Sequence, residues 1–145
     1  MKAVILAGGK GTRLAPYTMV FPKPLMPIGE RPILEVVIRQ LKHCGCEEVI
    51  MAVGHLAELL MAYFNDGHRL GVPIRYSKES TPLGTAGPLA LIDGLDETFL
   101  VMNGDVLTTL DYRELMRRHR GSGAVATIAT HEREVKIDLG VVESD

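Results

Sequence analysis

A glycine-rich loop near the start of the chain, followed by two cations, holds the residues best suited to chemistry. Gly8, Gly9 and Gly11 lie within four positions, and Arg13 and Lys23 follow them. Glycines lack a Cβ, so their backbone N–H groups can come close to phosphate oxygens. A guanidinium and an ammonium group can neutralise charge that backbone dipoles alone cannot. These residue types in this order predict a binding site for a polyanion such as a triphosphate.

Two familiar glycine-loop patterns fail on the same residues. The dinucleotide fingerprint G-x-G-x-x-G, started at Gly9, requires a glycine where the chain has Leu14. The Walker pattern requires a glycine at Val4 and a serine or threonine at Gly11. A glycine-rich turn without a ligand is the alternative for the glycines alone. The two cations argue against that alternative.

The elements that must position this loop follow an alternating pattern of apolar strands and amphipathic helices. Such alternation is typical of parallel strands joined by crossover helices. It predicts an α/β, Rossmann-like three-layer fold with a mostly parallel central sheet, in which the loop lies at the carboxyl end of a buried strand. The expected strands are 2–7, 49–53, 73–77, 98–102 and 124–130, and the expected helices run from Pro32 to Gly45, through Leu56 to Gly67, from near Thr85, and from a cap at Asp111 to Arg120.

The end of the chain reads as an incomplete sheet. Residues 139–143 form an apolar strand pattern that is cut short, and a sheet that ends on an unsupported apolar strand is exposed to wrong pairing. We therefore expect this chain to be the N-terminal part of a longer protein.

Composition indicates a globular protein that acts on small molecules. The chain has 145 residues, 46% of them hydrophobic and 23% charged, which fits one domain with a substantial core. A net charge of −2 argues against a nucleic-acid binder. No apolar run approaches a membrane span, and two cysteines are too few for a disulfide framework, so we expect a cytoplasmic protein without membrane contact. The spacing of His43, Cys44, Cys46 and His55 does not match a zinc site, and we interpret them as packing or surface groups.

The motifs together resemble the sugar-phosphate nucleotidyltransferases, also called nucleotide-sugar pyrophosphorylases. The resemblance is closest to the mannose-1-phosphate guanylyltransferase branch, and it covers nearly the whole chain. It is carried by Gly8-Gly9-Lys10-Gly11-Thr12-Arg13-Leu14, Pro22-Lys23-Pro24-Leu25, Leu83-Gly84-Thr85-Ala86-Gly87, Asn103-Gly104-Asp105 and Gly140-Val141-Val142.

The resemblance implies an enzyme that transfers a nucleotidyl group from a nucleoside triphosphate to a sugar 1-phosphate and releases pyrophosphate, using Mg²⁺. It implies catalytic roles for Arg13, which would hold the pyrophosphate, and Lys23, which would lie between the two reacting phosphates. Asp105 would bind the metal, although a turn aspartate bonding its own backbone is the alternative on sequence alone. The implied nucleotide contacts are Leu6, Ala7, Gly8, Gly9, Gly11, Thr12, Glu79, Gly84 and Thr85, and the implied sugar contacts are Asn103 and Gly140.

Glu79 bears on the choice of base. Many uridylyl- and thymidylyltransferases of this family carry glutamine at this place, five residues before Gly84. A carboxylate only accepts hydrogen bonds, and guanine offers two adjacent donors where uracil and thymine offer one. The residue therefore favours GTP. Leu139 replaces a tyrosine common in the family, which leaves the sugar contacts open.

Three alternatives stay open at this point. The protein could use UTP or dTTP with glucose 1-phosphate, or it could be a regulatory subunit that senses sugar nucleotides without turnover. A dehydrogenase is a distant third, because Leu14 breaks its fingerprint. Residues 1–145 would form the nucleotide-binding part of a single domain whose sugar-side portion is absent, so the chain alone would be poorly active. A homo-oligomer is compatible with the resemblance.

Overall fold

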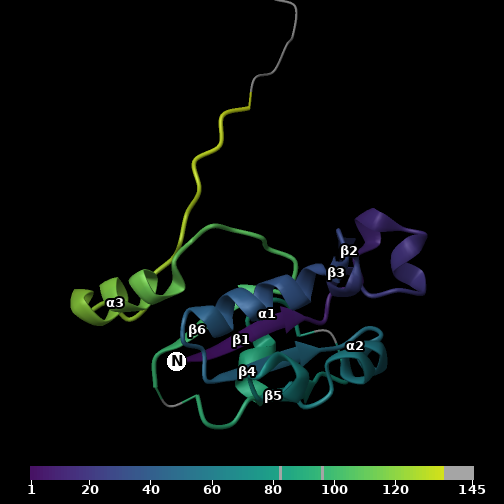
Figure 1. The fold of residues 1–145 in the computed structure, drawn as a ribbon, viewed down its shortest axis with the longest axis horizontal. Helices are drawn as coiled ribbons and strands as arrows, with labels where there is room; N and C mark the ends of the chain where they lie inside the picture. The colour runs from purple at the N-terminus through teal and green to yellow at the C-terminus, as the bar shows by residue number, and fades with distance from the viewer. Residues whose placement is uncertain (82, 96, 136–145) are drawn as a thin grey trace, which may run out of the picture.

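Four parallel strands form the central sheet of this protein. The computed structural model describes residues 1–81, 83–95 and 97–135. The sheet order is β5-β4-β1-β6, and β1 pairs along its whole length with β4, with Lys2 opposite Glu48 and Ala7 opposite Val53 (Figure 1). The two central strands, β1 and β4, are largely buried on both faces, which explains their continuous apolar runs. The strands are β1 (Lys2–Ala7), β4 (Glu48–Val53), β5 (Ile74–Lys78) and β6 (Phe99–Asn103).

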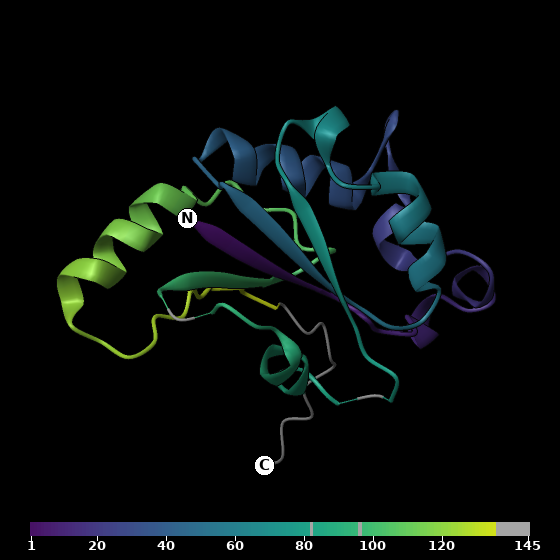
Figure 2. The same ribbon diagram turned by 90° about the horizontal axis from the view of Figure 1, so that it is seen from below.

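Helices cover the two faces of this sheet unequally. Two helices, α1 (Ile33–His43) and α2 (Ala57–Phe64), lie on one face, and a short 3-10 helix, Gly87–Leu91, lies on the other (Figure 2). The main core includes Ile5 and Met51 from the sheet and Leu34 from α1, all fully buried. A smaller cluster of Val4, Ile50 and Ile92 fills the second face. The predicted α/β fold with a parallel sheet is confirmed.

Local sequence signals explain where the helices begin and end. In α1 the apolar residues recur at helical spacing, and Leu34, Val37, Ile38 and Leu41 are all fully buried. The third helix, α3 (Tyr112–Ser122), begins after Asp111, whose carboxylate accepts hydrogen bonds from the backbone N–H groups of Arg113 at 2.9 Å and Glu114 at 3.3 Å. The predicted cap is confirmed, and the helix continues two residues beyond Arg120.

Two predicted elements are wrong. The helix expected near Thr85 is only the 3-10 helix Gly87–Leu91, because Gly84 adopts φ 77° and Pro88 cannot donate a helical hydrogen bond. The strand expected at 124–130 is unpaired chain, with Ile128 83% exposed, because β propensity does not supply a partner strand. The strand expected at 139–143 lies outside the described residues.

The segment between β1 and α1 contains short structure that the sequence analysis read as loop. A short hairpin is formed by two strands of two residues each, β2 (Pro27–Ile28) and β3 (Arg31–Pro32). Its turn contains Gly29, which adopts φ 61°. Three 3-10 helices precede it, Thr12–Leu14, Tyr17–Met19 and Lys23–Leu25. Among the described residues, none of the helices has both the length and the apolar character to cross a bilayer.

A buried carboxylate joins α1 to α2. The Glu35 side chain on α1 is 5% exposed and accepts hydrogen bonds from Arg39 Nε at 3.0 Å and from the Tyr63 hydroxyl on α2 at 2.9 Å. The Arg69 guanidinium lies 3.4 Å from the same carboxylate and 4.8 Å from the centre of the Tyr63 ring. Burial alone would raise the pKa of Glu35, but the hydrogen bonds from Arg39 and Tyr63 outweigh it and hold the pKa below its ordinary value of 4.5.

We predict that Glu35→Gln lowers the free energy of unfolding at neutral pH by about 1–3 kcal/mol, because its partners lose a charged acceptor. Since the folded-state pKa is depressed, this stabilisation is complete above pH 4.5 and is lost as the pH falls through the folded pKa. Urea unfolding followed by circular dichroism from about pH 7 to about pH 3 should show a shallower acid decline in the variant than in the wild type. Glu30→Gln, at an exposed position, should keep the wild-type pH profile, and identical profiles for both variants would contradict the prediction.

Candidate functional site

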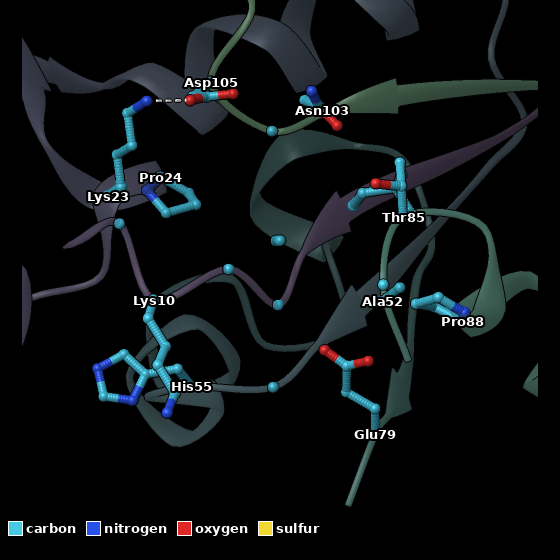
Figure 3. A pocket seen from close by; sticks show the side chains of 18 of the residues that line it. Lys10, Lys23, Pro24, Ala52, His55, Glu79, Thr85, Pro88, Asn103 and Asp105 are labelled. Atoms are coloured by element: carbon cyan, nitrogen blue, oxygen red, sulfur yellow. Dashed lines mark ion pairs between the residues drawn. The ribbon is translucent and has the colours of Figure 1, made fainter. Parts of the chain in front are cut away.

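A cavity of about 880 Å³ opens at the carboxyl ends of the four parallel strands. Residues from the ends of β1, β4, β5 and β6 all reach it, together with the loops that follow them (Figure 3). In open α/β sheets, ligands bind at this edge because loops from neighbouring strands converge there. The cavity is lined by Leu6, Ala7, Gly8, Gly9, Lys10, Gly11, Arg13, Lys23, Pro24, Ala52, Gly54, His55, Lys78, Glu79, Ser80, Thr81, Gly84, Thr85, Pro88, Asn103, Gly104 and Asp105.

The glycine-rich loop reverses direction at Gly11. This residue adopts φ 62°, a left-handed conformation that favours glycine, and its carbonyl accepts a hydrogen bond from Leu14 N–H at 2.9 Å. The turn opens the 3-10 helix Thr12–Leu14, which presents Arg13 to the cavity. Thr12 does not line the cavity. The side chain of Arg13 is exposed and can therefore reach an anion held there.

A carboxylate occupies space that two missing side chains leave open. A Cβ added to Gly54 would lie 2.8 Å from Glu79 Oε1, and a Cβ added to Gly8 would overlap the same oxygen. Glu79 follows β5, where its N–H bonds the Val53 carbonyl at 3.0 Å, and its other carboxylate oxygen accepts from Leu83 N–H at 3.3 Å. The acceptor group of Glu79 is therefore seated against the backbone of two neighbouring strand ends, facing the cavity (Figure 3).

Lys23 and Asp105 form an ion pair on the opposite side of the cavity (Figure 3). Lys23 begins the 3-10 helix Lys23–Leu25, and the buried Pro24 and Leu25 anchor its backbone. Asp105 follows β6 after Gly104, whose N–H bonds the Leu6 carbonyl at 3.0 Å. The two side chains are 40% and 26% exposed, so both charged groups remain accessible from the cavity. Each charge is neutralised by the other when no ligand is bound.

The lining side chains carry more positive than negative charge. Four cationic residues, Lys10, Arg13, Lys23 and Lys78, face two carboxylates, Glu79 and Asp105. Lys78 also pairs with Glu58 on α2. In a chain of net charge −2, this local excess of cations attracts an anionic ligand.

Asp105 offers a hard oxygen ligand that fits Mg²⁺. Among the described residues, no group of three or more histidine, cysteine, aspartate or glutamate side chains could hold a metal ion. Mg²⁺ in phosphate-handling sites commonly binds one or two carboxylates and completes its shell with water and substrate phosphates. Of the described lining residues, Asp105 is the one carboxylate on the Lys23 side of the cavity, which suits a metal that arrives with phosphate and does not suit a cage made wholly of protein.

The structure brings most of the predicted site residues together around this one cavity. Thr12 is excluded from the lining, and Gly140 lies outside the described residues. Sequence reasoning missed several lining residues that directly follow strands, such as Gly54 and His55 after β4. The available signal was topological, because residues after parallel strands meet at one edge of the sheet. The other missed lining residues are Lys10, Pro24, Ala52, Lys78, Ser80, Thr81, Pro88 and Gly104.

The remaining candidates for metal binding do not gather. Cys44 and Cys46 are free thiols, and the Cys46 Sγ donates to the Glu48 carbonyl at 3.1 Å. Burial is the main reason that the pKa of the Cys46 thiol is raised. His55 instead faces the cavity, in a place that the sequence did not reveal.

Comparison with known proteins identifies similar chains along the whole sequence. Residues 2–145 match the protein family described as Nucleotidyl transferase. A UTP–glucose-1-phosphate uridylyltransferase from Synechocystis is 41% identical over 100% of this chain and 41% of its own length. Mannose-1-phosphate guanylyltransferase 1 from Arabidopsis thaliana is 39% identical over 98% of this chain and 41% of its own length. The chain thus spans about two fifths of the length of the curated relatives it matches.

A solved structure shares the fold described above. HddC from Yersinia pseudotuberculosis, complexed with GMP-PN, superposes with a TM-score of 0.70 at 29% identity, covering 81% of this chain and 53% of that chain. Relatives that are named for different bases have nearly the same identity to this chain. Overall similarity therefore does not select a base, and the argument for one depends on the residues that line the cavity.

We predict that Gly8→Ala displaces the Glu79 carboxylate, because the new methyl group would take its place. The side-chain end is free to move, so the free energy of unfolding should change by less than about 1 kcal/mol. If GTP binds in this cavity through Glu79, its affinity measured by calorimetry should fall by about tenfold, the effect of losing a charged hydrogen-bond acceptor. In a Glu79→Ala background the same substitution should add little, since both changes remove one contact. Fully additive losses would show that Gly8 and Glu79 act independently.

Proposed function

This chain belongs to the nucleotidyl transferase family, and we propose that it transfers a nucleotidyl group from a nucleoside triphosphate, preferentially GTP, to a sugar 1-phosphate. Mannose 1-phosphate or a similar sugar phosphate is the proposed acceptor, and the products are pyrophosphate and a nucleotide sugar. In this proposal residues 1–145 supply the nucleotide-binding part of one domain, and the protein works on small molecules in the cytoplasm. The name of the guanylyltransferase relative supports this choice.

The observation that carries the proposal is the convergence of opposite kinds of charge on one cavity. Cations on the glycine-rich loop and at Lys23 can hold phosphates, and the Glu79 carboxylate can accept hydrogen bonds from a base. Both lie at the carboxyl edge of the same sheet, within a cavity of about 880 Å³, a size that suits a nucleotide.

The reaction requires two anions to approach each other. A sugar phosphate oxygen attacks the α-phosphorus, and the mutual repulsion must be screened by fixed positive charge. Lys23 suits this task because Pro22 and Pro24 restrict the backbone on both sides of it. Its ammonium group now rests on Asp105, so substrate phosphates must compete with that carboxylate for it. Arg13, in the 3-10 helix that follows the glycine-rich loop, would hold the departing pyrophosphate. The attacking phosphate is already ionised, so no general base is required.

Asp105 would hold Mg²⁺, and Asn103 would contact the sugar. When bound, this ion supplies charge stabilisation on the phosphate oxygens of the leaving group. The Lys23 ammonium beside Asp105, together with the other cations that line the cavity, supports a site that receives metal and phosphate together.

Glu79 is the proposed reader of the base. Guanine presents N1–H and its amino group side by side, and one carboxylate can accept from both. Gly8 and Gly54 leave the space that this carboxylate occupies, and the Leu83 N–H donates to it at 3.3 Å. A uridylyl- or thymidylyltransferase is the second candidate, favoured by the uridylyltransferase among the relatives. A regulatory subunit that binds sugar nucleotides without turnover is the third, and the presence of Arg13, Lys23 and Asp105 argues against it.

We predict that in the full-length protein GTP outperforms UTP and dTTP in pyrophosphate release when each is supplied with Mg²⁺ and a sugar 1-phosphate. Glu79→Gln should lower kcat/KM for GTP by about tenfold and should reduce the preference over UTP, because an amide replaces one acceptor with a donor. Glu30→Gln, which changes an exposed carboxylate away from the cavity, serves as the control. A higher kcat/KM for UTP or dTTP in the wild type would overturn the base assignment.

We predict that Lys23→Met lowers kcat by about 10²- to 10³-fold while the Kd for the nucleotide changes far less, because the lysine acts on charge that develops during transfer. Single-turnover kinetics and calorimetry measure the two quantities separately. Lys42→Met, which removes an ammonium group outside the cavity, should leave both values near those of the wild type. Equal losses in kcat/KM and nucleotide affinity would assign Lys23 to ground-state binding only.

A further inference from the structure

His55 contacts both ends of the segment that carries the glycine-rich loop. Its backbone N–H donates to the Gly8 carbonyl at 3.4 Å, and its ring Nε2 lies 3.2 Å from the Thr18 carbonyl. A carbonyl oxygen can only accept, so Nε2 must carry the hydrogen in this contact. His55 comes from the β4–α2 connection, far from this segment in sequence.

Thr18 passes this contact on to the turn of the loop. Its hydroxyl donates to the Gly11 carbonyl at 2.8 Å, the same oxygen that accepts from Leu14 N–H. The Thr18 side chain is 3% exposed, whereas residues 12–17 and 19–21 are all exposed. The segment therefore has little apolar burial to hold its shape. Hydrogen bonds hold it instead: those inside its two 3-10 helices, and a short series from His55 to Thr18 and from Thr18 to Gly11.

The backbone beside His55 adopts a conformation that its neighbours must maintain. Leu56 has φ 55°, in the left-handed region that a leucine side chain rarely adopts. Such a residue persists where the surrounding structure holds it in place. Leu56 lies between His55 and the start of α2 at Ala57.

We infer that His55 is a positioning residue that clamps the segment 8–18 by donating its Nε2 hydrogen to the Thr18 carbonyl. The clamp holds the left-handed turn at Gly11, and with it the backbone N–H groups and Arg13 that face the cavity. Only the nature of the bound anion, a triphosphate, rests on the proposed function. The clamp consists only of contacts within the chain, and it gives His55 a role beyond the packing or surface position expected from the sequence.

The test compares two side chains of equal length. Glutamine reaches as far as the histidine Nε2 and can donate a hydrogen there, whereas methionine cannot. In the ligand-free protein, hydrogen exchange of the amides in residues 11–20 should become about three- to tenfold faster in His55→Met than in the wild type, the effect expected for one lost hydrogen bond. His55→Gln should restore most of the protection. Unchanged exchange in His55→Met would overturn the inference.

A binding measurement separates positioning from general stability. Inorganic tripolyphosphate, which has no base and no sugar, should bind His55→Met about three- to tenfold more weakly than His55→Gln. Faster loop exchange with unchanged tripolyphosphate affinity would overturn the positioning role. Equal weakening in both variants, together with equal loss of global stability in urea, would identify an ordinary structural histidine and would also overturn it.

Thr18 supplies the matched second test. Thr18→Val keeps the shape but loses the hydroxyl, and Thr18→Ser keeps the hydroxyl, so only the valine variant should reproduce the exchange and binding changes. Combining Thr18→Val with His55→Met should cost less than the sum of the single changes, because both act through one segment. Additive effects would contradict the clamp. Failure of nucleotidyl transfer would bear on the proposed function alone, since neither hydrogen exchange nor tripolyphosphate binding requires turnover.

Discussion

The pairing of β1 between β4 and β6 is the interaction on which the rest of this structure depends. Ala7 lies opposite Val53, and Leu6 lies opposite Asn103, so three segments distant in sequence end at the same level. The glycine-rich loop, the turn that carries His55 and the turn that carries Asp105 leave the sheet together. β1 and β4 are largely buried on both faces, and a slip of one residue would exchange the side chains that pack on the two faces, so close packing favours one register.

Charged side chains in the cavity make contacts within the protein that a ligand can replace. Lys23 rests on Asp105, and the Glu79 carboxylate rests against the backbone at Gly8 and Gly54. Partly exposed ion pairs of this kind contribute little to stability, so exchanging one partner for a phosphate need not disturb the fold. Glu35 differs, because its carboxylate is buried between α1 and α2 and serves the framework. The partly exposed carboxylates thus serve the cavity, whereas the buried carboxylate of Glu35 stabilises the framework.

Local patterns predicted the framework well and its connections less well. The buried strands and α1 have strong apolar periodicity, and their positions were found within about two residues. The stretch after Gly84 and the segment 124–130 carry helix and strand signals, yet neither forms the expected element. Pro88 limits the first, and the second has no paired neighbour within the part of the chain that the structure describes. Propensity is local, whereas strand pairing depends on distant residues.

The sequence by itself determined the class of fold and the chemistry that gathers at one edge of it. Glycines, cations and a carboxylate after a strand have meanings that follow from residue type and spacing. Tertiary structure alone decided which of these groups meet, that Lys23 pairs with Asp105, that Glu79 rests where Gly8 and Gly54 lack side chains, and that His55 contacts Thr18. The physical reason is that these contacts join segments from different strand ends, whose distances are set by sheet register and not by separation along the chain.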